Sequence, residues 1–183
     1  MNSQQIKEIL LSEIHEVSIN YEKYCNDPKH DFSRKRKLPF ELMLKNIIGM
    51  GSKSITNELI DIFQASGEMP SASAFVQQRT KIKPEALKAV FDGFMSRILA
   101  SADKMRILAV DGSDIQIETN PKDKTSHIST SIDKKSFNLL HLNALYDLEE
   151  HVYTDAIIQA AKSQNEHRSE EHTSELQSRS DLV

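Results

Sequence analysis

The stretch ILAVDGSDI, residues 107–115, decides the fold class, because the spacing of apolar residues changes there. Before this stretch, apolar side chains recur every three or four residues, as they do on one face of a helix. From Ile107 to Val110 they form a short continuous run, which predicts a buried β-strand that ends at Asp111-Gly112. The sequence therefore predicts an α+β protein in which helices precede strands.

The residues up to 104 are predicted to form an all-helical N-terminal region. Serine before the third and fourth helices is a typical N-cap, and proline is favoured in the first turn of the fifth. The cap candidates are Ser52 or Ser54, and Ser71 or Ser73. The five predicted helices cover residues 6–24, 40–48, 52–63, 71–79 and 84–99.

The residues after the first strand predict a polar connection followed by a hairpin. Residues 118–136 are rich in turn formers, whereas 137–146 and 151–158 are rich in apolar residues and have the length of strands. The residues between these two strands include Asp147, Glu149 and Glu150, and acidic residues in a turn are expected to be solvated.

The composition excludes several classes of protein. The 183-residue chain has a formal net charge of −4, so its overall charge does not indicate a nucleic-acid binder. Cys25 is the single cysteine, which excludes an internal disulfide and a cysteine-rich zinc site. No apolar run approaches the ~18 residues that span a bilayer. We expect a protein of a reducing compartment, the cytoplasm, with no membrane segment.

Asp111 is the candidate catalytic and metal-binding residue. A carboxylate at the end of a strand, next to glycine, lies at the rim of a sheet where a metal ion or substrate can reach it. The alternative is that Asp111 begins a turn. Asp114 lies three positions later and, with a strand period of two, would be on the opposite face, where we expect a structural or supporting role.

Basic residues in the N-terminal region are candidate contacts to DNA phosphates. The run Arg34, Lys35, Arg36 and Lys37 reads either as a phosphate-binding segment or as a solvated connector. The third and fourth helices could form a helix-turn-helix-like pair, with simple helix packing as the alternative. In the first interpretation the residues near phosphates are Lys53, Arg79, Lys81 and Lys83.

Four segments, taken in order, resemble a known family. They are KLPFELMLKNIIGMGSKSITNELIDIF (37–63), PSASAFVQQRTKI (70–82), AVDGSDIQI (109–117) and FNLLHLNALYDLEEHVYTDAIIQ (137–159). Over residues 37–167 the chain resembles the N-terminal part of a bacterial insertion-sequence transposase of the DDE class, in the group founded on insertion sequence 4.

The resemblance implies a DNA-processing function. Residues 1–104 would contact double-stranded transposon ends, and residues 105–167 would begin a ribonuclease H-like domain with its first three antiparallel strands. Asp111 matches the first of the three acids, Asp, Asp and Glu, that hold two Mg²⁺ ions for DNA strand cleavage and transfer. The implied location is the bacterial cytoplasm, on the nucleoid when bound to DNA. A homodimer of the full-length protein is compatible with the family.

The chain departs from the family pattern at its C-terminal end. The segments that carry the second Asp and the Glu do not occur, so we expect this chain to be catalytically inactive and the ribonuclease H-like domain to be truncated. Residues 168–178, RSEEHTSELQS, resemble the conceptual translation of a sequencing adapter. Residues 168–183 are therefore expected to be a non-native, disordered tail, with an ordinary disordered C-terminus as the alternative.

Two other functions remain open at the level of sequence. One is a non-catalytic DNA-binding module or regulator formed by the helical part. The other is a helical protein-interaction domain with no role in nucleic-acid binding. Salt-dependent affinity for DNA separates these two classes, because phosphate contacts release counterions.

Overall fold

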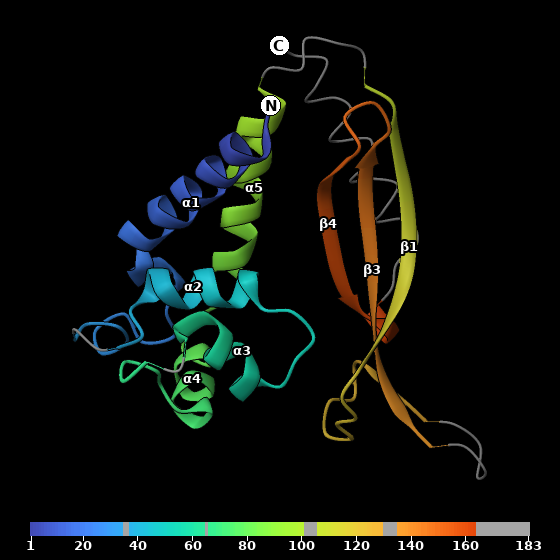
Figure 1. Cartoon of the computed structure of the whole chain (residues 1–183). Coiled ribbons are helices and arrows are strands. Elements are labelled where there is room, and N and C mark those ends of the chain that lie inside the picture. The colour runs from blue at the N-terminus through green and yellow to red at the C-terminus, as the bar shows by residue number, and fades with distance from the viewer. Residues whose placement is uncertain (35–36, 65, 101–105, 130–134, 164–183) are drawn as a thin grey trace. The chain divides into compact units, whose positions relative to one another are not determined.

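The computed structural model describes residues 1–34, 37–64, 66–100, 106–129 and 135–163. The expected non-native tail, together with Lys35 and Arg36, lies outside these residues. The chain divides into two compact units, residues 1–103 and residues 104–183, called here the helical unit and the sheet unit. In the described residues the fold is α+β, with five α-helices followed by an open antiparallel sheet of four strands (Figure 1).

The helices of the helical unit begin close to the positions that the sequence predicts. Ser54 caps α3 by accepting the N–H of Asn57, and Ser71 caps α4 by accepting the N–H of Ala74. The first helix is shorter than predicted, because a 3₁₀ turn replaces its last part. The elements are α1 (Ser3–Ile19), the 3₁₀ turn η1 (Tyr21–Tyr24), α2 (Phe40–Gly49), α3 (Ile55–Phe63), α4 (Ala72–Arg79) and α5 (Glu85–Leu99).

Two apolar clusters form the core of the helical unit. The first joins α1, α2 and α5, and its buried residues are Ile14, Val17, Cys25, Phe40, Leu44, Ala86 and Val90. The second joins α2, α3 and α4, and its buried residues are Leu38, Met43, Leu59 and Phe75. Burial raises the pKa of the Cys25 thiol to about 11, so this cysteine is a packing residue and not a nucleophile.

A short antiparallel contact ties the segment after η1 to the segment after α4. Cys25 and Ile82 form an isolated β-bridge. The backbone N–H of Asn26 donates to the carbonyl of Lys81 at 3.0 Å, and the N–H of Lys83 donates to the carbonyl of Tyr24 at 2.8 Å. Residues that are more than fifty positions apart in the sequence are therefore fixed beside one another.

The sheet unit is built around one long central strand. The strands are β1 (Leu108–Ile117), β2 (His127–Ile128), β3 (Phe137–Asp147) and β4 (Val152–Ala160). β3 pairs antiparallel with β1 along one edge and with β2 and β4 along the other. The predicted hairpin of the last two strands is confirmed. The predicted end of the first strand at Asp111-Gly112 is wrong, because β1 continues to Ile117.

The sheet buries few apolar side chains. Val110 of β1 is 48% exposed and Ile158 of β4 is 63% exposed, so the prediction of a buried first strand is also wrong. β1 pairs with one neighbour and lies at an edge of the described sheet, and most of its side chains are exposed. Fully buried residues of this unit include Ser126, Asn138 and Asp147, all polar. Across the described residues, every helix is too short or too polar to cross a membrane.

Candidate functional site

Asp111 lies in the middle of β1, opposite Ala144 of β3, and not at a strand end. Its side chain is exposed and makes no hydrogen bond or ion pair with another described residue. On the same face, Ala156 of β4 is the next residue across the sheet. Because its neighbours across the sheet are alanines, the carboxylate is open to solvent and sterically accessible to a cation.

The surroundings of Asp111 do not make a complete magnesium site. Mg²⁺ takes oxygen ligands, commonly one or two carboxylates together with waters and substrate phosphates. The described residues contain no group of three His, Cys, Asp or Glu side chains that could hold a metal ion. Asp155 precedes Ala156 on β4 and alternates to the other face of the sheet. Asp111 can therefore supply one ligand of a metal site.

The opposite face of β1 carries a hydrogen-bonded group of three polar side chains. His141 Nδ1 lies 2.8 Å from Asp114 Oδ1, and His141 Nε2 lies 3.2 Å from Asn143 Oδ1. Gly112 makes room for the ring, since a Cβ at this position would lie 3.0 Å from His141 Nε2. The glycine that was predicted to end the strand instead accommodates the imidazole within it. The side chains of Asp114 and His141 are thus hydrogen-bonded to one another across the strands, which is consistent with the structural or supporting role expected for Asp114.

Asp147 is fully buried, which corrects the expectation of a solvated acid in the hairpin turn. Its carboxylate accepts the backbone N–H groups of Glu149 and Glu150 at 3.0 and 3.1 Å. It also forms an ion pair with Arg106, whose Nε lies 2.6 Å from Oδ2. Burial pushes the pKa of Asp147 upward, but these three donors outweigh it and hold the pKa below its usual value. Asp147 is a structural anion of the turn.

Most of the basic residues predicted to contact DNA have partners within the helical unit. Lys37 donates to the carbonyl of Gly67 at 2.8 Å, and Lys53 pairs with Asp61 at 2.5 Å. Lys83 reaches the carbonyl of Lys23 at 3.4 Å. Arg79, in the last turn of α4, is exposed.

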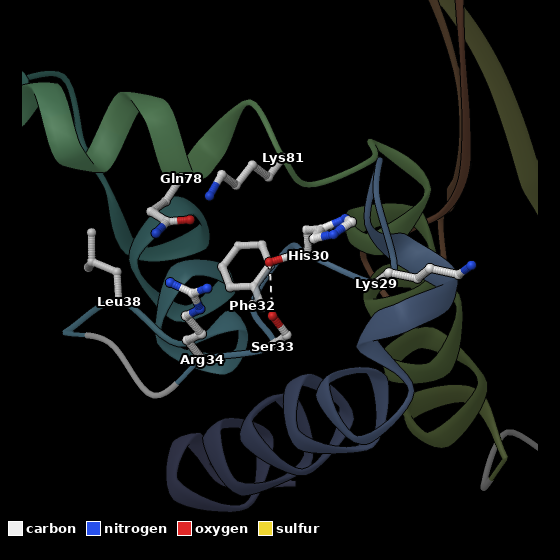
Figure 2. A pocket seen from close by; sticks show the side chains of 8 residues that line it. All are labelled: Lys29, His30, Phe32, Ser33, Arg34, Leu38, Gln78 and Lys81. Atoms are coloured by element: carbon white, nitrogen blue, oxygen red, sulfur yellow. Dashed lines mark hydrogen bonds between the residues drawn. The ribbon is translucent and has the colours of Figure 1, made fainter.

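Two of the predicted residues, Arg34 and Lys81, are brought together at a cavity of about 340 Å³. Figure 2 shows its lining, which comes from the segment after η1 and from the C-terminal end of α4 and the residues after it. Lys81 Nζ lies 3.8 Å from the buried carboxylate of Asp31. The cavity-lining residues are Lys29, His30, Phe32, Ser33, Arg34, Leu38, Gln78 and Lys81.

The sequence did not mark Gln78, His30 and Ser33, which line this cavity together with the basic residues. No local pattern marks them, because the cavity is lined by two segments far apart in the sequence, which the Cys25–Ile82 bridge holds near one another. The chain matches no family model, no curated protein and no solved structure. Two features of the geometry bear on function: an open carboxylate on β1 and a cationic cavity in the helical unit.

Proposed function

We propose that the chain is part of a DNA transposase of the DDE class, in which the helical unit binds DNA and Asp111 is one of the metal-binding carboxylates. The observation that carries the proposal is the position of Asp111, an exposed carboxylate with no partner among the described residues, on a strand whose register places alanines opposite it. A carboxylate with no partner in the protein keeps its oxygens free for a cation.

The sheet is compatible with this role. β1, β3 and β4 lie side by side and antiparallel, which is the arrangement that the resemblance implies for the start of a ribonuclease H-like domain. Exposed apolar residues on both faces, such as Val110 on one and Ile158 on the other, leave the sheet available for further packing. The arrangement of the strands supports the proposal for the fold. The role of Asp111 as a metal-binding carboxylate depends on the resemblance to the transposase family.

The same geometry predicts that this chain does not cleave DNA. Two-metal phosphoryl transfer needs several oxygen ligands around a pair of cations. The described residues supply a single open carboxylate at Asp111 and no cluster of three ligands. We therefore expect no Mg²⁺-dependent nicking of transposon-end duplex by the purified 183-residue chain. Robust nicking that disappears in Asp111→Asn would contradict the incomplete site.

DNA binding is tested separately by fluorescence anisotropy with a labelled duplex at several salt concentrations. The logarithm of the binding constant should fall linearly with the logarithm of salt, by about 0.9 for each phosphate contact. Asp111→Asn is the matched control, because removing this charge in the sheet unit should leave the affinity of the helical unit nearly unchanged. An absence of salt-dependent binding would reject a DNA-binding role.

A non-catalytic DNA-binding module is the second candidate. The observation that favours it is again the lone carboxylate, since a module needs the helical unit and no metal centre. It predicts full DNA affinity with no effect of Mg²⁺ at constant ionic strength. A transposase fragment predicts that Mg²⁺ binds weakly at Asp111, which is visible as a metal-dependent shift of the Asp111 and Gly112 amide resonances.

A further inference from the structure

The structure points to a second property of the helical unit: we propose that the cavity between the segment after η1 and the end of α4 binds a phosphate group. Its lining contains three cationic side chains, Lys29, Arg34 and Lys81, and no acidic side chain among the described residues. Lys81 is half-buried and Arg34 is exposed at the rim, so the cavity concentrates positive charge, which attracts anions.

The cationic groups come from two segments that the fold holds together. In Figure 2 the ends of Arg34, Gln78 and Lys81 are directed toward the space around Phe32, whereas the ammonium of Lys29 points away. Asp31 lies behind Lys81, with Nζ and Oδ1 3.8 Å apart, and also accepts the N–H of Asp27 at 2.9 Å. The Asp31 carboxylate partly neutralises the positive charge of Lys81. It does not neutralise the charge of Arg34.

Gln78 adds an observation that is independent of charge. Its Oε1 atom is buried and accepts no hydrogen bond from any described residue. An unpaired buried acceptor costs about 1–3 kcal/mol. Rotation of the carboxamide by half a turn puts an N–H donor in the same place. Gln78 also lines the cavity, so an amide N–H of its carboxamide can donate to an oxyanion held there.

The shape of the lining is held by the core beneath it. Phe32 has a positive φ of 56°, an uncommon conformation for a bulky residue. Its ring packs edge-on against Phe40 at a centroid distance of 5.2 Å. Ser33 donates its hydroxyl to the carbonyl of His30 at 3.0 Å. Packing of Phe32 on the core therefore fixes the turn that carries Arg34, which gives the site a preformed wall.

Phosphate suits this lining better than a carboxylate does. A guanidinium, an ammonium and an amide offer donors from several directions, and a phosphate has more oxygens to receive them than the two of a carboxylate. The phosphate could belong to a DNA backbone, as the proposed function requires, or to free phosphate. The chemistry of the site is the same in both cases, so the experiment separates the sources.

The test is an NMR titration of the ¹⁵N-labelled full chain with inorganic phosphate at constant ionic strength. The expected result is a saturable shift of the Gln78 side-chain amide and of the backbone amides of residues 29–34. Gln78→Glu keeps the size of the side chain but adds a negative charge, and should weaken binding by about tenfold or more. Gln77→Glu, the same substitution at the exposed neighbouring position of α4 outside the cavity, is the matched control and should leave phosphate affinity within about twofold, since exposed charges contribute little.

Several outcomes would overturn the site. They are shifts that stay linear with phosphate, shifts spread equally over exposed residues such as Lys7, equal shifts with acetate, and unchanged binding in Gln78→Glu. If Gln78→Glu does not fold, Arg34→Gln gives the same comparison at an exposed position. Competition by a DNA duplex for these resonances assigns the phosphate to DNA. If phosphate saturates the cavity and DNA does not displace it, the ligand is free phosphate. The phosphate site would then stand, but the cavity would have no part in the proposed DNA binding.

Discussion

The most deeply buried side chains of the helical unit and of the sheet unit differ in kind. The helical unit encloses apolar residues such as Phe75, Leu44 and Ile14, each with less than 2% of its surface exposed. In the sheet unit, the side chains buried to the same degree include Ser126, Asn138 and Asp147, while Val110 and Ile158 remain exposed. The helical unit is therefore stabilised mainly by apolar packing, and the sheet unit by hydrogen bonds to buried polar groups.

The largest expected loss of stability follows from the truncation of an apolar core side chain in the helical unit. Phe75→Ala removes a fully buried ring from the cluster of α2, α3 and α4. Truncation of a core phenylalanine costs about 3–5 kcal/mol. Amide hydrogen exchange should show this loss across the helical unit and no change in β3. Ile60→Ala, at a position 40% exposed on α3, is the control and should cost much less.

If Phe75→Ala lowered the protection of β3 and of the helical unit equally, the two units would unfold together and their stabilities could not be compared separately. If it cost less than about 1 kcal/mol, apolar packing would not be the main stabilising term.

The next effect concerns the polar centre of the sheet unit. Asn138 Nδ2 donates to Ser126 Oγ at 2.8 Å and to the carbonyl of Asn120 at 3.1 Å, while Asn138 Oδ1 accepts the N–H of Asn120 at 2.8 Å. Asn138→Ala leaves these groups without a partner, at a cost of about 2 kcal/mol. Exchange should accelerate in β2 and β3. Gln116→Ala, exposed on β1, is the control, and equal effects of the two changes would contradict a role for buried polar groups.

The elements that local patterns encode were predictable, and those that depend on distant contacts were not. Ser54 and Ser71 mark helix starts because an N-cap interacts within its own first turn. The hairpin of β3 and β4 likewise follows from two adjacent apolar runs. In contrast, β1 passes through Gly112 because it pairs with β3 as far as Ile117, and the space beside the glycine is filled by His141 of that strand, which no local pattern reveals.

The candidate sites show the same division. Asp111 could be selected from the sequence, because the resemblance covers the strand that carries it. The position of Asp111 in the middle of β1 could not be predicted, because it depends on pairing with β3. The buried state of Asp147 depends on Arg106, which lies 41 positions earlier. Gln78 joins Arg34 at the cavity only through the closure of the Cys25–Ile82 bridge.

A smaller change in the free energy of unfolding is expected when a tightly packed glycine in either unit is replaced by alanine. A Cβ at Gly93 of α5 would overlap the carboxylate of Glu13, which is buried and paired with Arg97. Gly93→Ala should cost about 1–2 kcal/mol, although alanine gains up to about 1 kcal/mol in helix propensity. Gly112→Ala requires the imidazole of His141 to shift by a few tenths of an ångström. This substitution should change the free energy of unfolding by less than about 0.5 kcal/mol.

Thermal unfolding of both variants measures this difference, and a Glu13→Ala background tests its cause. Without the Glu13 carboxylate, Gly93→Ala should become neutral or stabilising, because the overlap is gone and the propensity gain remains. A cost that persists in this background would place the conflict elsewhere in the packing of α1 on α5.

The smallest effect is a local dependence on pH in the turn before β2. The hydroxyls of Ser126 and Thr125 donate to Asp123 and lower the pKa of its carboxyl to about 2 from 3.8. Because the pKa is lowered in the folded state, the stabilisation is complete above pH 3.8 and is lost as pH falls through about 2.

Amide exchange of Ser126 and His127 should therefore accelerate between about pH 4 and pH 2, beyond the intrinsic pH dependence of exchange, with the Leu44 amide of the apolar core as internal reference. Asp123→Asn removes the titrating group but retains an oxygen acceptor, so the additional pH dependence should disappear while the turn still forms. Persistence of that dependence in Asp123→Asn would assign it to another carboxylate. Its disappearance would show that a polar turn of the sheet unit responds to acid where an apolar cluster of the helical unit does not.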